Sequence, residues 1–258
     1  MNTSKLAVAA VISLGMTAPA LAATIGIDFV GENPDLKVAP SATAGIPEIA
    51  QANWNPLQVS NNDANGYNNS GSLVTIVDSD GNPVNGMTVT VTPLDGGLWP
   101  KDGADWGFTG SNADLQKGLV WSKFRITITG IPYAEYDIYA YAGADGNAGA
   151  GKVSISVAED AEGSVDADST KYYRVAWLAG QFVRSDAATL DDAIAESGNY
   201  VVFSGNTAKD VWIDWDGTVY GAWTGATAIQ IVPVPEPSAL AGLALAGVAL
   251  CARRRRIA

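Results

Sequence analysis

The chain has 258 residues and a formal net charge of −12, with one cysteine and no histidine. The lack of histidine excludes His-based catalytic triads, histidine metal sites and histidine-ligated haem. The single cysteine, Cys251, lies in an apolar run near the C-terminus. The rest of the chain therefore folds without disulfides and without a cysteine nucleophile, which leaves carboxylate chemistry or binding without chemistry.

The first 22 residues have the layout of a secretory signal peptide. Lys5 is the only charge, residues 6–16 are apolar, and Ala20 and Ala22 are small residues two positions apart. This arrangement predicts export across a cytoplasmic membrane and cleavage after Ala22. Pro19 interrupts the pattern where a cleavage region belongs and argues against a buried N-terminal helix.

Residues 23–232 form the predicted ectodomain, and this segment is strongly acidic. It holds 26 acidic and ten basic side chains, a formal charge of −16. Such a surface repels nucleic acid and anionic lipid, because phosphate contacts need Lys and Arg. We therefore expect no nucleic-acid partner. The segment is long enough for one large β domain, and no repeat or strong linker divides it.

Alternation of apolar and polar residues predicts that the ectodomain is all-β. Val89 and Val91 stand among threonines, and Phe124, Ile126 and Ile128 alternate with polar residues. Turns rich in Asp, Asn and Gly separate the runs. We predict an antiparallel β-sandwich or jelly roll. The expected strands are 24–30, 72–77, 87–92, 120–129, 136–142, 153–158, 171–178, 198–204, 210–214 and 226–232.

One helix is predicted, over residues 187–196. Ser185 or Asp186 would be its N-cap, and Gly198 lies just beyond its end. A polar loop is the alternative. Residues 61–72, rich in Asn, Gly and Ser, are expected to form a long exposed loop.

All eight tryptophans lie in the ectodomain, and their aromatic faces are suited to stacking on sugar rings. Neighbouring amides and carboxylates would hydrogen-bond the sugar hydroxyls. The candidate ligand-binding residues are Asn53, Trp54, Asn55, Trp99 and Trp106. The alternative for each tryptophan is packing in the core, since this side chain is usually largely buried. Trp121 and Trp177 fall within predicted strands and are expected in the core.

Two acidic turns suggest bound calcium as the alternative to a chain that holds no metal. Asp78, Asp80 and Asn82 alternate before Pro83, and Asp214 and Asp216 flank a tryptophan. Oxygen ligands at alternate positions can surround Ca²⁺, but neither segment has the EF-hand spacing. Turns of this composition are common without metal, so we expect no metal site and no cofactor.

The C-terminus combines a proline motif, an apolar run and a basic tail. Pro235, Glu236 and Pro237 precede residues 239–252, which carry no charge. As a helix this run is about 21 Å long, short of the roughly 30 Å of a bilayer core. We predict a short transmembrane helix that tethers the chain for a time, with the basic tail in the cytoplasm. The helix includes Ala239, Leu243 and Leu250, and the tail is Arg253, Arg254, Arg255 and Arg256.

These three elements in this order resemble the PEP-CTERM sorting signal, with Pro235, Glu236 and Pro237 matching its motif. The resemblance implies that an exosortase-type membrane protease recognises the motif and removes the helix. The protein would then reach the cell surface or the extracellular matrix. An ordinary tail anchor is the alternative. The prolines fix φ and disfavour helix before them, which keeps the motif extended and accessible.

The ectodomain shows a second resemblance. Residues 25–29 (Ile-Gly-Ile-Asp-Phe), 130–132 (Gly-Ile-Pro) and 228–232 (Ala-Ile-Gln-Ile-Val) resemble a group of PEP-CTERM ectodomains that are similar to galactose-binding-like jelly rolls. This resemblance implies a carbohydrate-binding type of sandwich.

Three interpretations of function follow. The first is an exported surface or matrix protein that binds polysaccharide, such as the exopolysaccharide that its sorting system accompanies. The second is a structural surface protein without a specific ligand. The third is a carbohydrate-active enzyme that uses two carboxylates. With so many acidic residues, some pair satisfies any sequence test, so we assign no catalytic residue and expect no enzyme.

Overall fold

The computed structural model describes residues 23–31, 33–59, 70–166 and 169–235. The predicted signal peptide, with Ala20 and Ala22, lies outside these residues. So do Glu236, Pro237, the predicted membrane helix and the arginine tail. In the described part of the chain, no helix has the length and apolar character needed to cross a membrane.

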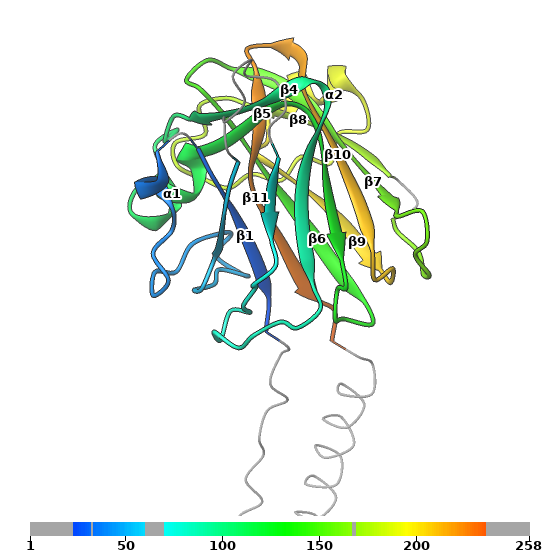
Figure 1. Ribbon diagram of the computed structural model, residues 1–258. Coiled ribbons are helices and arrows are strands. Elements are labelled where there is room, and N and C mark those ends of the chain that lie inside the picture. Colours follow the sequence, from blue (N-terminus) through cyan, green and yellow to red (C-terminus); the bar gives the residue numbers. More distant parts are fainter. Residues whose placement is uncertain (1–22, 32, 60–69, 167–168, 236–258) are drawn as a thin grey trace, which may run out of the picture. The chain divides into compact units, whose positions relative to one another are not determined.

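The prediction of an all-β sandwich is confirmed. The described residues form 11 strands in one branched sheet that folds into two layers (Figure 1). One layer has the order β2 (Asn55–Gln58), β1 (Ile25–Val30), β11 (Thr224–Pro233), β6 (Tyr136–Ala144) and β9 (Tyr200–Asn206). The other has the order β3 (Gly71–Leu73), β4 (Thr88–Asp102), β5 (Gly118–Thr129), β10 (Val211–Gly221), β7 (Gly149–Val157) and β8 (Thr170–Val175). These pairs are antiparallel except β1 with β2.

The two layers are joined where β5 meets β11. Trp121 pairs with Gly225, and Val120 pairs with Ala226, before β11 continues between β1 and β6. Gly225 has to be glycine here, because a Cβ atom would lie 2.0 Å from the carbonyl oxygen of Val120. This close approach brings the start of β5 and the start of β11 together at one end of the sandwich.

The main core lies between the layers and follows the predicted alternation. Phe124, Ile126 and Ile128 of β5 are fully buried. They stand opposite Trp215 and its neighbours in β10, and the ring of Phe124 stacks on that of Trp215 with centroids 6.0 Å apart. Burying side chains of this size stabilises the fold by about 1.5–3 kcal/mol each.

A second, smaller core covers the outer face of the layer that contains β1 and β11. It is formed by Val38, Ala44, Ile46, Trp54, Leu115, Tyr141 and Ala228. Helix α1 (Ser111–Lys117) contributes Leu115 to this core, and helix η1 (Pro34–Leu36) lies next to α1. Because both cores consist of residues within the compact unit Ala23–Val234, we expect this unit to fold on its own.

Asp28 is an acidic side chain in this second buried region. Its carboxylate Oδ2 accepts a hydrogen bond of 2.9 Å from the backbone N–H of Val38, while Oδ1 has no partner. Burial raises the pKa of Asp28 to about 7, the bond from Val38 lowers it, and the charge of Asp114 raises it further. The fold therefore carries a carboxyl group that titrates near neutral pH.

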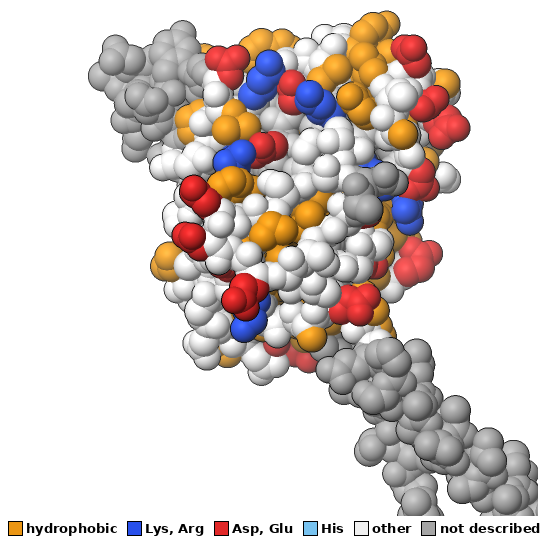
Figure 2. Space-filling view, turned by 90° about the vertical axis from the view of Figure 1, so that its right-hand side faces the viewer, with side chains coloured by type: hydrophobic (Ala, Val, Ile, Leu, Met, Phe, Trp, Pro, Cys, Tyr) orange, Lys and Arg blue, Asp and Glu red, His pale blue; other side chains and the backbone are white. Residues whose placement is uncertain are grey.

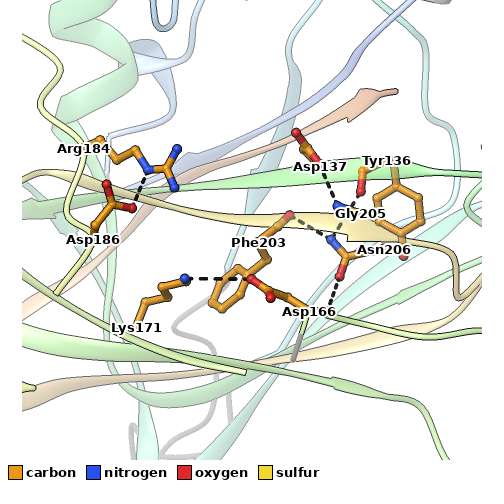
Figure 3. Close-up of polar contacts among 9 residues, drawn as sticks. All are labelled: Tyr136, Asp137, Asp166, Lys171, Arg184, Asp186, Phe203, Gly205 and Asn206. Carbon is orange, nitrogen blue, oxygen red and sulfur yellow. Dashed lines mark hydrogen bonds and ion pairs between the residues drawn. The ribbon is translucent and has the colours of Figure 1, made fainter. Parts of the chain in front are cut away.

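Asn206 ties β6 and β9 to the loop that precedes β8 (Figure 3). Its side-chain N–H group donates to the carbonyl oxygens of Phe203 at 2.8 Å and Tyr136 at 3.3 Å. Its oxygen accepts from the backbone N–H of Asp166 at 3.0 Å, and Asp166 also forms an ion pair with Lys171. Asn206 is fully buried, so these bonds satisfy a polar group that water cannot reach.

Several element boundaries differ from the predicted ones. β4 continues to Asp102, so residues 95–102 are strand rather than loop, and β2 and α1 were not predicted. Helix α2 (Leu190–Glu196) begins later than expected because Thr189, rather than Ser185 or Asp186, is its N-cap. β8 ends at Val175, two residues before Trp177. Of the loop predicted over 61–72, residues 61–69 lie outside the described part.

Candidate ligand-binding site

A pocket of about 470 Å³ opens at the end of the sandwich where β5 and β11 begin. Its lining combines aromatic faces with one basic and one acidic side chain. The lining residues are Trp99, Lys101, Trp121, Asp145, Ala222 and Trp223. Ligand sites of this volume are typically apolar with a few polar groups that fix orientation.

Strand pairing places two of the tryptophans side by side. Trp99 of β4 is the direct cross-strand partner of Trp121 of β5. Side chains in this relation lie on the same face of the sheet with Cβ atoms about 4.5–5.5 Å apart. The register of β4 shifts between Asp95 and Trp99, so the alternation that holds earlier in the strand does not extend to this pair.

The third tryptophan comes from the connection between β10 and β11. The Trp223 ring packs edge-on against the Trp121 ring, with centroids 5.3 Å apart and an interplanar angle of 68°. Trp223 is 46% exposed, so part of its indole surface is open to solvent. Three tryptophans from three separate strands or turns therefore converge at one place.

Asp145 reaches the pocket from the turn between β6 and β7. This turn is held to the β10–β11 connection by a hydrogen bond of 3.3 Å from the N–H of Ala222 to the carbonyl oxygen of Ala148. The indole N–H of Trp106 donates to the carbonyl oxygen of Ala144, next to Asp145, at 3.2 Å. Trp106 is only 7% exposed. It belongs to the main core and is not among the lining residues, so its burial argues against the predicted sugar contact.

The predicted contact group around Trp54 is also internal. Trp54 is 3% exposed, and its indole N–H donates to the carbonyl oxygens of Ala44 and Gln51. Asn55 bonds the backbone of Gly26 and Val77, while Asn53 adopts a positive φ of 55° and donates to Ser79. These bonds leave Trp54 and Asn55 no surface for a ligand. Of the five predicted contacts, the structure brings only Trp99 to the pocket.

The predictions for Trp121 and Trp177 differ from the structure, because Trp121 lines the pocket and Trp177 is 69% exposed. Reasoning from sequence missed Trp223 as well. Its only signal is its position in a short connection between two strands. Trp177 lies outside the pocket lining, so it is a single exposed aromatic residue without pocket neighbours.

The indole N–H groups separate the tryptophans into two kinds. Trp54, Trp106 and Trp215 are buried, and each donates to a protein oxygen; the acceptor for Trp215 is the hydroxyl of Tyr173 at 2.8 Å. Trp121 differs, because its Nε1 is buried without an acceptor.

Charged side chains elsewhere are engaged with one another. Arg125 donates to both oxygens of Asp214 at 2.7 and 2.8 Å, and this bond raises the pKa of Arg125. The Arg125 guanidinium also lies over the Trp212 ring, 4.2 Å from its centre, and so covers one face of this ring. Acidic and basic side chains are interspersed on the side of the sandwich near β7 (Figure 2).

The two acidic turns make internal bonds. Asp78 Oδ1 accepts from the backbone N–H groups of Asp80 and Asn82, and Asp214 is paired with Arg125. Asp216 accepts from the backbone N–H and the hydroxyl of Thr218. Within the described residues, no three acidic or cysteine side chains are grouped to hold a metal ion.

The C-terminal end of the domain leads directly into the predicted motif. β11 pairs with β6 as far as Pro233, and the N–H of Val234 donates to the carbonyl oxygen of Glu135 at 3.0 Å. Pro235 follows and is exposed. Residues 233–256 match the family model described as the PEP-CTERM protein-sorting motif. The chain carries a PEP-CTERM sorting signal.

The PEP-CTERM signal establishes the route of this protein: export, a membrane-anchored precursor and then the cell surface. It also implies processing by an exosortase, a membrane protein. No curated protein and no solved structure gives a significant match to the chain. The likeness to galactose-binding-like folds therefore stays a prediction.

Proposed function

We propose that the ectodomain of this PEP-CTERM protein binds polysaccharide at the pocket lined by Trp99, Trp121 and Trp223. The convergence of three tryptophans on one pocket is the observation that supports it. Indole faces provide large, rigid apolar contact area, and partly exposed indoles at an opening can stack on sugar rings. Lys101 and Asp145 supply charged groups at the same pocket.

The proposal is binding without chemistry. Hydrolysis of a glycosidic bond uses two carboxyl groups about 5–9 Å apart across the substrate. Asp145 is the single acidic residue among those that line the pocket. The pocket lining thus supports a binding role in preference to the two-carboxylate alternative.

Affinity gel electrophoresis tests the proposal directly. The domain Ala23–Val234 is run through gels that contain exopolysaccharide from the native host or defined soluble polysaccharides. We expect retardation that Trp99→Ala and Trp223→Ala each weaken at least about tenfold, which corresponds to about 1.4 kcal/mol or more. Trp177→Ala is the control, because it removes an exposed tryptophan outside the pocket.

Circular dichroism and urea unfolding establish that each variant is folded. The proposal is wrong if no polysaccharide retards the domain, which is the outcome expected of a purely structural surface protein. It is also wrong if Trp177→Ala reduces retardation as much as the pocket variants do.

A further inference from the structure

Trp121 lines the pocket, and its Nε1 is a buried hydrogen-bond donor without an acceptor. Buried N–H groups in native proteins are nearly always paired, because an unpaired one loses its bond to water and gains nothing. The other buried tryptophans of the described chain follow this rule, as Trp54, Trp106 and Trp215 show. The exception is therefore specific to the residue that lines the pocket.

The neighbour that packs against Trp121 is partly open to solvent. Trp223 contacts Trp121 edge-on and is nearly half exposed. Because Nε1 is itself buried, a ligand oxygen reaches it only when a neighbouring side chain shifts, and Trp223 is the partly exposed neighbour in ring contact with Trp121.

The charges of the domain favour an uncharged ligand. The pocket lining holds one basic and one acidic side chain, Lys101 and Asp145. The ectodomain as a whole has a formal charge of −16. A polysaccharide with a carboxylate on every repeat would be repelled by this field, whereas a neutral chain would not. The hydroxyl and ring oxygens of neutral sugars are also suitable acceptors for an indole N–H.

We propose that the pocket selects uncharged sugar units and that Trp121 Nε1 donates a hydrogen bond to a sugar oxygen. This inference rests on the proposed polysaccharide binding and specifies the class of ligand. Stacking on Trp99 and Trp223 supplies contact area, and the single directed bond from Trp121 sets the orientation of the sugar.

The class of ligand is tested with two sets of polysaccharides in the same affinity gels at low and physiological salt. Dextran, galactomannan and hydroxyethyl cellulose are the neutral set, while alginate and polygalacturonate are the acidic set. We expect retardation by at least one neutral polymer and none by the acidic ones. Retardation by acidic polymers alone, lost in Trp223→Ala, would overturn this inference and leave the proposed function standing. If no polymer retards the domain, both are wrong.

The donor role is tested by replacing the Trp121 indole with benzothiophene through site-specific incorporation of the benzothienyl amino acid. This change keeps the bicyclic aromatic shape and replaces the N–H by a sulfur atom that cannot donate a hydrogen bond. For the neutral polymer that retards the wild-type domain, we expect about tenfold weaker binding, which is the usual effect of losing one neutral hydrogen bond. The same replacement at Trp177 is the matched control and should leave binding unchanged.

If the replacement perturbs folding, a spectroscopic measurement on the unmodified domain tests the hydrogen bond from Trp121. In ¹H–¹⁵N spectra, the Trp121 indole resonance, assigned with Trp121→Phe, should move downfield as the neutral polymer is added. Wild-type affinity after the benzothiophene replacement, or an indole resonance that stays in place at saturation, would refute the hydrogen bond from Trp121. Neither result would contradict stacking of the sugar on Trp99 and Trp223.

Discussion

Replacing Asp28 by asparagine should make the stability of the ectodomain much less sensitive to a rise in pH from 4 to 8. Asn keeps an oxygen that accepts the bond from the N–H of Val38 and has no charge to bury. Burial raises the pKa of Asp28 from an ordinary value of 3.8 to about 7 in the folded domain. Each pKa unit corresponds to about 1.36 kcal/mol, so ionising this group costs the folded state about 4 kcal/mol.

The sign follows from proton binding. Between pH 4 and pH 7 the folded domain holds a proton on Asp28 that the unfolded chain has released, so stability falls as pH rises through this range. Above about pH 8 both states are ionised and the loss is complete. Asp28→Asn carries no such loss, so its advantage over the wild type should grow by about 4 kcal/mol from pH 4 to pH 8 and then stay constant.

Urea unfolding of both proteins at intervals from pH 4 to pH 9 measures the difference between their free energies of unfolding. The other carboxyl groups titrate in both proteins, so their contribution cancels in this difference. Asp114→Asn is a useful companion, because it removes a negative charge that raises the pKa of Asp28. It should leave the onset of the fall near pH 4 unchanged, end the fall at a lower pH and make the total loss of stability smaller. Parallel pH profiles for wild type and Asp28→Asn would refute the argument.

Two further substitutions test the packing and hydrogen bonding of the fold away from the pocket. Trp54→Ala removes a buried indole from the second core and should destabilise the domain by about 3–5 kcal/mol in urea unfolding; a loss below 1 kcal/mol would mean that Trp54 is not packed as described. Asn206→Ala leaves the partners at Asp166, Tyr136 and Phe203 unsatisfied and should cost about 1–3 kcal/mol or more by the same assay. Lys171→Ala, which breaks only the partly exposed ion pair to Asp166, should cost about 1 kcal/mol or less, and equal losses for the two variants would contradict this assignment.

The β class and most strands could be predicted from sequence, because alternation at residues such as Phe124, Ile126 and Ile128 reports directly which face of a strand is buried. β1 and β11 are buried on both faces by the second core, so alternation is absent there. Helix α1 was missed because it has only seven residues, and Gly110 at its N-cap makes no side-chain bond.

The site was harder to predict than the strands. Asn53, Trp54 and Asn55 combine the residue types that bind sugars, yet the same types also satisfy buried backbone groups, and here they do. Trp99 meets Trp121 only through the register of β4 with β5, and Trp121 meets Trp223 only through the junction of β5 with β11. Register across strands that are distant in sequence is not encoded in any local pattern, so the pocket depends on the three-dimensional fold.

The length of β11 sets the distance between the pocket and the point at which the chain leaves the domain. Trp223 immediately precedes this strand, and Val234 immediately follows it. Ten residues of strand at about 3.3 Å each separate the two by about 30 Å. The proposed ligand site and the start of the sorting segment therefore lie at opposite ends of one strand, so a protease that acts on the motif and a ligand in the pocket use separate parts of the molecule.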